Sequence, residues 1–168
     1  MQDSCAITDI LVIIPRIDRY DLAILTALQS DSRMSWIELG EAVSLSATAA
    51  QRRVRALQEA GVIKRFTVAL DRNLLGHGLH AFVSVSIDRK ETQLAEEFRN
   101  RVQAYPEVQA CYKLSGNVDY LLDIVAADIQ TYGRFIEQKI LSLAAVKDAS
   151  SAIVLDTIKE PRATIPRA

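Results

Sequence analysis

The sequence predicts a two-domain α+β protein of 168 residues. Apolar residues recur at helical spacing from Asp18 to Gly61, which predicts an all-helical first half. From Leu79 onward, alternating runs typical of strands are mixed with helical segments, which predicts a small sheet with helices. The halves meet at DRNLLGHG, residues 71–78, where glycine and asparagine favour turns. We therefore expect two domains joined by a hinge.

Three helices are expected in the first half. Asp18 is positioned to cap the first helix, and Ser35 with Glu38 forms a capping-box pattern for the second. Ser46 is positioned to cap the third helix, which ends near Gly61. A short turn separates the second and third helices, so the three have the proportions of a helix-turn-helix unit.

Gly40, inside the second helix, supports this interpretation. A residue without a side chain costs helix stability but allows a crossing helix to approach closely. A generic three-helix bundle is the alternative, because helix-turn-helix patterns are weak signatures.

The third helix carries a basic cluster in a chain whose formal net charge is −1. Residues 46–65 hold five basic residues and one acidic residue, whereas residues 18–45 hold two basic and five acidic residues. Because the total charge is nearly neutral, binding to nucleic acid would have to use such a local patch. A solvated helix face with incidental arginines is the alternative.

The first side chains of this helix are short, which lets a recognition helix approach base edges in the major groove. Helical periodicity turns Arg52 and Arg55 away from the apolar stripe and leaves Arg53 at its flank. Thr48, Gln51 and Arg52 are candidates for contacts with bases, and the other two arginines for contacts with phosphates. The full candidate DNA-binding set is Ser46, Ala47, Thr48, Gln51, Arg52, Arg53, Arg55 and Lys64.

The second half predicts the order strand, helix, strand, strand, helix, strand. LHAFVSVSI, residues 79–87, alternates apolar and polar residues, and residues 91–104 carry apolar residues at helical spacing. VQACYKLS and YLLDIVA flank the turn GNVD, Asp128 can cap a helix, and a last strand is expected near residues 146–158. This is the ferredoxin-like βαββαβ arrangement. Its helices would cover one sheet face, so we expect a dimer formed through the other.

These segments together resemble the leucine-responsive regulator and AsnC family, also called feast/famine transcriptional regulators. The resemblance extends from Ile17 to Lys159 and is carried in order by IDRYDLAIL, RRVRALQEAGVI, FVSVSI, PEVQACYKLSGNVDYLL and TYGRFIEQKI. It implies a winged or simple helix-turn-helix domain that binds double-stranded DNA, and a ferredoxin-like domain that binds an amino-acid effector between subunits. It also implies dimers that assemble into tetramers, octamers or larger rings.

The family's glycine and aspartate turn corresponds to Gly116, Asn117 and Asp119. Gly116 would let backbone amides approach a carboxylate, and Asp119 would accept hydrogen bonds from an α-ammonium group. A plain hairpin turn is the alternative. The effector-site candidates are Ser115, Gly116, Asn117, Val118, Asp119, Ser150 and Ser151.

The chain departs from the family pattern at several positions. Many members have prolines in place of Ala47 and Ala49, and a glycine in place of Ser44. The alanines alter the geometry at the start of the recognition helix. Asn117 stands where the family has an aspartate, and the loss of this carboxylate weakens the case for an ordinary amino-acid effector.

The expected organisation is an extension over residues 1–16, a helix-turn-helix domain over 17–66, a connecting strand and hinge over 67–78, a ferredoxin-like domain over 79–159 and a tail over 160–168. The apolar run at residues 10–14 is too short to span a membrane. Cys5 and Cys111 show no pairing pattern, so we expect a cytoplasmic protein without membrane association.

Two other functions compete with this interpretation. An enzyme would use Cys111 as nucleophile with His77 or His80 as base, and the same histidines would offer only two ligands to a metal. Neither pattern is persuasive, so we expect no catalytic residues, no metal and no cofactor besides the effector. The second alternative is an effector-binding or assembly module that has lost specific DNA binding.

Overall fold

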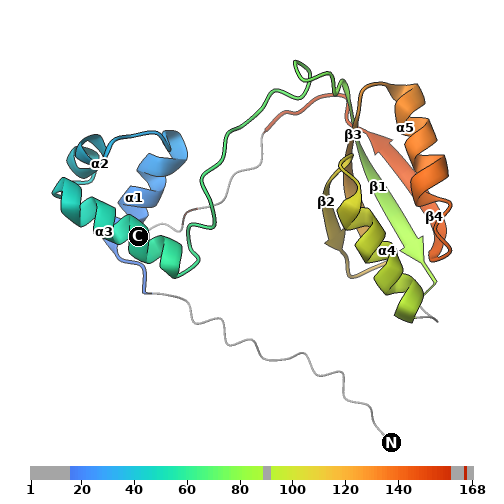
Figure 1. Cartoon of the computed structure of the whole chain (residues 1–168), viewed down its shortest axis with the longest axis horizontal. Coiled ribbons are helices and arrows are strands. Elements are labelled where there is room, and N and C mark those ends of the chain that lie inside the picture. The colour runs from blue at the N-terminus through green and yellow to red at the C-terminus, as the bar shows by residue number, and fades with distance from the viewer. Residues whose placement is uncertain (1–15, 89–91, 160–164, 166–168) are drawn as a thin grey trace, which may run out of the picture. The chain divides into compact units, whose positions relative to one another are not determined.

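The computed structural model describes residues 16–88, 92–159 and 165. The chain forms two compact units, of which the second spans Ala69–Glu160 and the first contains the helices that precede it (Figure 1). Each unit has its own hydrophobic core. The predicted division into a helical domain and an α+β domain is therefore confirmed, while the expectations for residues 1–15 and for nearly all of the tail concern residues outside the described ranges.

The first unit consists of helices α1 (Arg19–Ser30), α2 (Trp36–Ala42) and α3 (Ala47–Glu59). Asp18 and Ser35 each form the capping box at the start of a helix, and the Ser46 hydroxyl accepts the Ala49 N–H at the start of α3. The predicted caps are thus confirmed. The helices enclose a small apolar core made of Ile24, Leu39, Val43, Ala50, Val54 and Leu57.

The turn between α2 and α3 is tight. A Cβ atom on Gly40 would lie 2.7 Å from the carbonyl oxygen of Leu45, so only glycine lets the backbone pass this closely. Ser44 adopts φ = 57°, a left-handed conformation that favours glycine. The expectation that Gly40 permits a close approach is confirmed.

The second unit is ferredoxin-like, as predicted. Its elements are β1 (Leu79–Ile87), α4 (Thr92–Ala104), β2 (Val108–Lys113), β3 (Tyr120–Ala126), α5 (Ile129–Phe135), the π-helical turn η1 (Ile136–Ile140) and β4 (Val146–Ile153). The strands form one antiparallel sheet in the order β2-β3-β1-β4. β4 ends before the predicted limit at residue 158, because its partner β1 begins only at Leu79.

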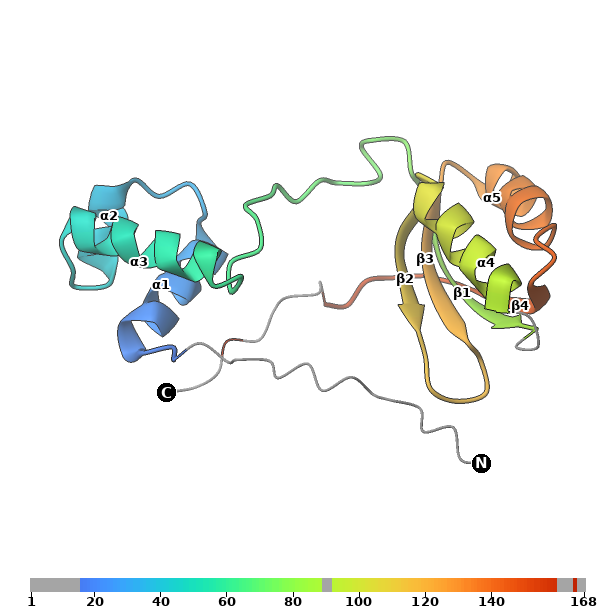
Figure 2. The same cartoon turned by 60° about the horizontal axis from the view of Figure 1, so that its bottom comes forward.

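Helices α4 and α5 lie on the same face of the sheet (Figure 2). Phe98 from α4 and Ile140 from η1 pack there on inward-facing strand residues such as Val83 and Leu122, all of them almost fully buried. The opposite sheet face has no covering helix among the described residues. It presents His80, Phe82, Ser84, Leu121, Asp123 and Ser150.

The connecting segment differs from the prediction, because the strand expected from residue 67 is absent from the described structure. Residues 64–70 belong to no helix or strand and have no ladder pairing, and residues 72–76 form a turn. A strand needs a neighbour for its backbone N–H and C=O groups, and this segment has none among the described residues. Phe66, Val68 and Leu70 remain 47%, 72% and 69% exposed.

No helix of the described residues is long and apolar enough to cross a membrane.

Candidate DNA-binding surface and effector pocket

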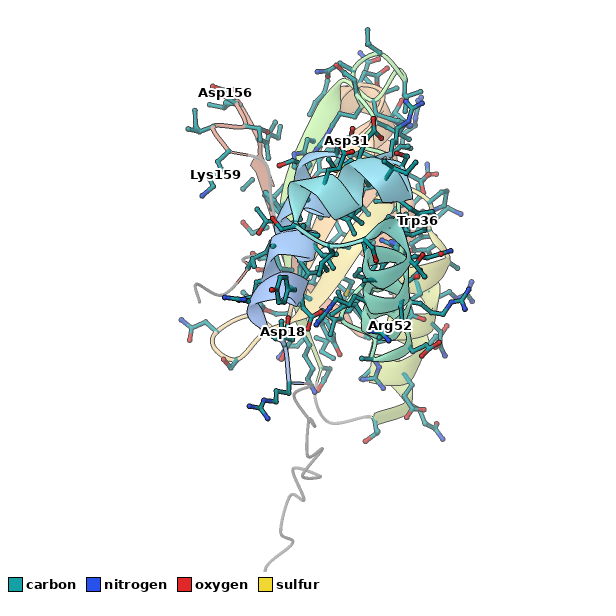
Figure 3. The ribbon with its side chains drawn as sticks, turned by 90° about the vertical axis from the view of Figure 1, so that its left-hand side faces the viewer. Asp18, Asp31, Trp36, Arg52, Asp156 and Lys159 are labelled. Atoms are coloured by element: carbon teal, nitrogen blue, oxygen red, sulfur yellow. The ribbon has the colours of Figure 1, made fainter. Side chains whose placement is uncertain are left out.

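Helix α3 separates a buried side from an exposed side. Ala50, Val54 and Leu57 face the core, whereas Arg52 and Arg55 are exposed. Arg52 is labelled in Figure 3 together with Trp36 at the start of α2. The predicted contact residues that the structure leaves exposed are Ser46, Thr48, Gln51, Arg52, Arg55 and Lys64, while Ala47 is half-buried.

Arg53 differs from the other two arginines. Its guanidinium lies 2.8 Å from the carboxylates of both Asp18 and Asp21, and 5.3 Å from the centre of the Tyr20 ring. Only 28% of the Arg53 side chain is exposed. These contacts brace α3 against α1, so the structure gives Arg53 an interaction within its own domain.

Hydrogen bonds shift the pKa values in this brace. The side-chain bond to Asp21 and then that to Asp18 raise the pKa of Arg53. The backbone N–H of Asp21, followed by the Arg53 guanidinium, lowers the pKa of Asp18. The Arg53 guanidinium and the Asp18 carboxylate are therefore charged at neutral pH. Sequence patterns did not indicate this brace, since its partners come from different helices.

A pocket of about 430 Å³ lies beside the hairpin that joins β2 and β3. It brings together three predicted effector residues, Ser115, Gly116 and Asp119. The ends of β1, α4 and β2 complete the wall with Ile87, Thr92, Ala95, Arg99, Lys113, Leu114 and Tyr120.

The hairpin is fixed to the sheet by Asp119. Its backbone N–H donates to Val85 O at 3.0 Å, and its carboxylate accepts the Ile87 N–H at 2.9 Å. Its carbonyl oxygen accepts the Leu114 N–H at 2.8 Å, which closes the hairpin. Gly116 adopts φ = 139°, a backbone conformation that favours glycine, and the space where a side chain would begin is open.

The remaining effector candidates do not line this pocket. Asn117 is exposed and Val118 half-buried. Ser150 and Ser151 lie on β4, which β1 separates from the β2–β3 hairpin. Ser151 accepts a hydrogen bond from the Tyr132 hydroxyl at 2.6 Å on the helix-covered side, and Ser150 faces the opposite side. One chain therefore does not bring all seven candidates together.

Arg99 and Lys113 are pocket residues that the sequence analysis missed. Lys113 pairs in register with the buried Tyr120 and so occupies an inward-facing strand position. The alternation of β2 alone could have marked Lys113, because it places a basic residue on the side of the sheet that faces the helices. Arg99 follows the buried Phe98 on α4, and nothing in the helical pattern marks it.

Among the residues considered for catalysis or metal binding, His77 and His80 line one pocket of about 500 Å³, and Cys111 does not line it. His80 contacts Asp123 at 2.8 Å on the sheet face without a covering helix, and His77 is exposed. Partial burial raises the pKa of the Cys111 thiol, which disfavours the thiolate that a nucleophile requires. In the part of the chain that the structure describes, no three His, Cys, Asp or Glu residues are grouped to hold a metal.

A capped helix-turn-helix unit with a basic third helix, followed by a ferredoxin-like domain with a pocket, defines a two-domain DNA-binding regulator. Comparisons with known families agree. Residues 17–58 match the AsnC-type helix-turn-helix domain, and residues 80–164 match the Lrp/AsnC ligand binding domain. The chain belongs to the Lrp/AsnC family of transcriptional regulators.

Similar proteins cover most of the chain. The proline dehydrogenase transcriptional activator of Rhizobium radiobacter is 37% identical over 144 residues, which are 86% of this chain and 92% of the relative. The leucine-responsive regulatory protein of Escherichia coli is 35% identical over 144 residues, 86% of this chain and 88% of the relative. A solved complex of a Neisseria meningitidis transcriptional regulator with L-methionine has a TM-score of 0.82 and 37% identity, covering 85% of this chain and 92% of that one.

Proposed function

We propose that this regulator binds specific DNA sequences through α3 and changes its DNA occupancy when an amino acid binds the C-terminal domain. The observation that carries the DNA-binding part is the asymmetry of α3. One side is buried in the domain core, and the other offers short and basic side chains to solvent. Because its buried side keeps α3 packed on the domain core, its exposed side can enter the major groove without a rearrangement of that core.

The exposed residues of α3 and the segment after it fall into two groups by the part of the DNA that we expect them to contact. Thr48, Gln51 and Arg52 are our candidates for base edges, and Arg55 and Lys64 for phosphates. Ser46 and Ala47 begin the helix, where backbone N–H groups favour a phosphate. Arg53 contributes by holding α3 in place through Asp18 and Asp21.

The effector would bind at the β2–β3 hairpin. Support comes from the pocket beside Ser115, Gly116 and Asp119, and from the methionine bound to the relative from Neisseria meningitidis. Asn117 and Val118 would form the rim of this pocket. Ser150 and Ser151, which do not line this pocket within one chain, would contribute from another subunit. An effector acts only if it binds one assembly or domain arrangement more tightly than another.

Self-association is part of the proposal. The sheet face that no described helix covers carries Phe82 and Leu121, and Tyr112 at the β2 edge is 52% exposed. A second copy would bury these side chains and present two α3 helices to two DNA half-sites. Dimers would then assemble into tetramers or octamers. We place this activity in the cytoplasm and assign no catalytic role.

The decisive experiment is a gel shift with the DNA upstream of the protein's own gene. We expect Arg52→Ala with Arg55→Ala to abolish the specific complex, whereas Lys147→Ala, a change at an exposed basic residue on β4, leaves it intact. Binding should weaken by orders of magnitude as salt rises from about 50 to 200 mM, because phosphate contacts release counterions. Equal, weak binding of every sequence by wild type and double variant would favour the assembly module without specific DNA binding.

A further inference from the structure

The effector pocket contains two basic side chains from separate elements. Arg99 comes from α4 and Lys113 from the end of β2, and both line the pocket beside the hairpin. Both also line an adjoining pocket of about 350 Å³, together with Tyr120. Arg99 and Lys113 therefore lie between the two pockets, and a ligand bound in either pocket would be close to both cations.

Arg99 has few strong contacts of its own. Its guanidinium donates a long bond of 3.5 Å to the Tyr120 hydroxyl and lies 3.8 Å from Glu96, whose side chain is 62% exposed. An ion pair with so exposed a carboxylate contributes little. A guanidinium has five N–H donors in a planar fork that matches a carboxylate. Arg99 is thus well suited to bind a carboxylate in the pocket.

The acidic side of the pocket is small. Among the lining residues that the structure describes, Asp119 is the one carboxylate, and it also accepts the Ile87 N–H. Asn117 provides a neutral amide on the same hairpin, where the family pattern has an aspartate. With two cations and one carboxylate among its described lining residues, the pocket favours a ligand that brings a net negative charge.

We propose that this pocket selects an acidic amino acid, an α-amino dicarboxylate such as glutamate or aspartate, over its neutral amide. This inference rests on the proposed effector function of the pocket. The α-ammonium group lies beside Asp119 and the α-carboxylate beside the hairpin backbone at Gly116. The second carboxylate binds Arg99 and Lys113, and this last contact provides the selectivity.

Calorimetric titration of the full chain tests the selectivity. L-glutamate and L-aspartate are compared with L-glutamine, L-asparagine, L-leucine and L-methionine. We expect the better acidic ligand to bind at least about tenfold more tightly than its amide, as hydrogen bonds to charged groups exceed those to neutral ones. Arg99→Gln and Lys113→Gln should each remove most of this preference, because they weaken the binding of the acidic ligand far more than that of its amide.

Arg101→Gln is the matched control. Arg101 lies on the same helix, is 60% exposed, pairs with Glu97 and does not line the pocket, so its loss should leave the preference intact. Tighter binding of leucine, methionine or an amide overturns the selectivity but leaves the amino-acid effector role standing. Succinate binding as tightly as aspartate overturns the contact between Asp119 and the α-ammonium group. Binding of no ligand overturns both the selectivity and the effector role, whereas the gel shift tests DNA binding separately.

Discussion

The guanidinium of Arg53 lies 2.8 Å from the carboxylate of Asp21, a residue 32 positions earlier in the chain. A second carboxylate, that of Asp18, lies at the same distance. The contact joins the start of α1 to the middle of α3, and 13% of the Asp21 side chain remains exposed. Within the basic cluster of α3, one arginine therefore positions the helix, while Arg52 and Arg55 extend into solvent.

Replacing Arg53 should destabilise the N-terminal unit. Arg53→Gln leaves two neighbouring carboxylates without their cation, and we expect unfolding to become easier by about 1 to 2 kcal/mol. The single tryptophan of the chain, Trp36 on α2, reports this unit by fluorescence during urea denaturation. Arg52→Gln is the matched control. It should change the free energy of unfolding by less than about 0.5 kcal/mol but abolish DNA binding. Equal stability of the two variants would contradict the brace.

Acid should destabilise the same unit. Hydrogen bonds from backbone N–H groups lower the pKa of Asp18 and that of Glu38 in the capping boxes of α1 and α2. The folded unit therefore binds fewer protons than the unfolded chain. The stabilisation is fully present above the unfolded pKa near 4, about the value for free carboxyl groups, and is lost as the pH falls through the folded pKa.

Trp36 fluorescence along an acid titration measures this loss. Asp18→Asn combined with Glu38→Gln should flatten the acid limb of the stability curve, since these side chains no longer titrate. Arg53→Gln should change the slope less, because the largest effect on the pKa of Asp18 is the Asp21 N–H, which remains. An unchanged slope in the double variant would exclude these caps as the cause.

Ser44→Gly should stabilise the turn of the helix-turn-helix unit. Ser44 is exposed and holds φ = 57°, which costs an L-residue more than it costs glycine. The greater conformational freedom of glycine in the unfolded chain offsets part of this gain. We therefore expect the free energy of unfolding, measured by urea denaturation, to rise by about 0.5 kcal/mol. Ser142→Gly, in the turn after η1, is the control, since its hydroxyl bonds Gln138 O and its loss should not stabilise. A lower midpoint for Ser44→Gly would show that the serine side chain contributes to the turn.

Gly40→Ala should have the opposite effect. The new Cβ would lie 2.7 Å from Leu45 O and 3.1 Å from Ala47 N, both of them backbone atoms that cannot rotate away. We expect a cost of about 1 to 3 kcal/mol and a displaced α3 that binds DNA more weakly. Gly133→Ala on α5 meets no atom within 4 Å and provides the control. Normal DNA binding by Gly40→Ala would mean that α2 and α3 separate without consequence.

Local signals account for most of what the sequence predicted correctly. Each cap residue bonds to backbone within three positions, as Asp18, Ser35 and Ser46 do, so the start of each helix can be inferred from neighbouring residues. The strands of the second unit follow from alternation, and the split βαβ pattern then fixes their order.

Contacts between elements were harder to predict. The Arg53 brace depends on the packing of α1 on α3, and Arg99 and Lys113 line one pocket only because α4 packs beside β2. The strand expected after residue 66 depends on a pairing partner that the chain itself does not provide. The resemblance groups Ser150 and Ser151 with the hairpin, although β1 separates them from it within one subunit and neither lines the pocket.

The unpaired segment over residues 64–70 also bears on how long the protein persists in a cell. Proteases cleave unpaired, extended backbone, and Val68 and Leu70 are largely exposed in the single chain. If association covers this segment, an unpartnered subunit is degraded first, and dilution should accelerate limited proteolysis there. Subunits made in excess of those that assemble would then be degraded, so that only the assembled regulator would accumulate.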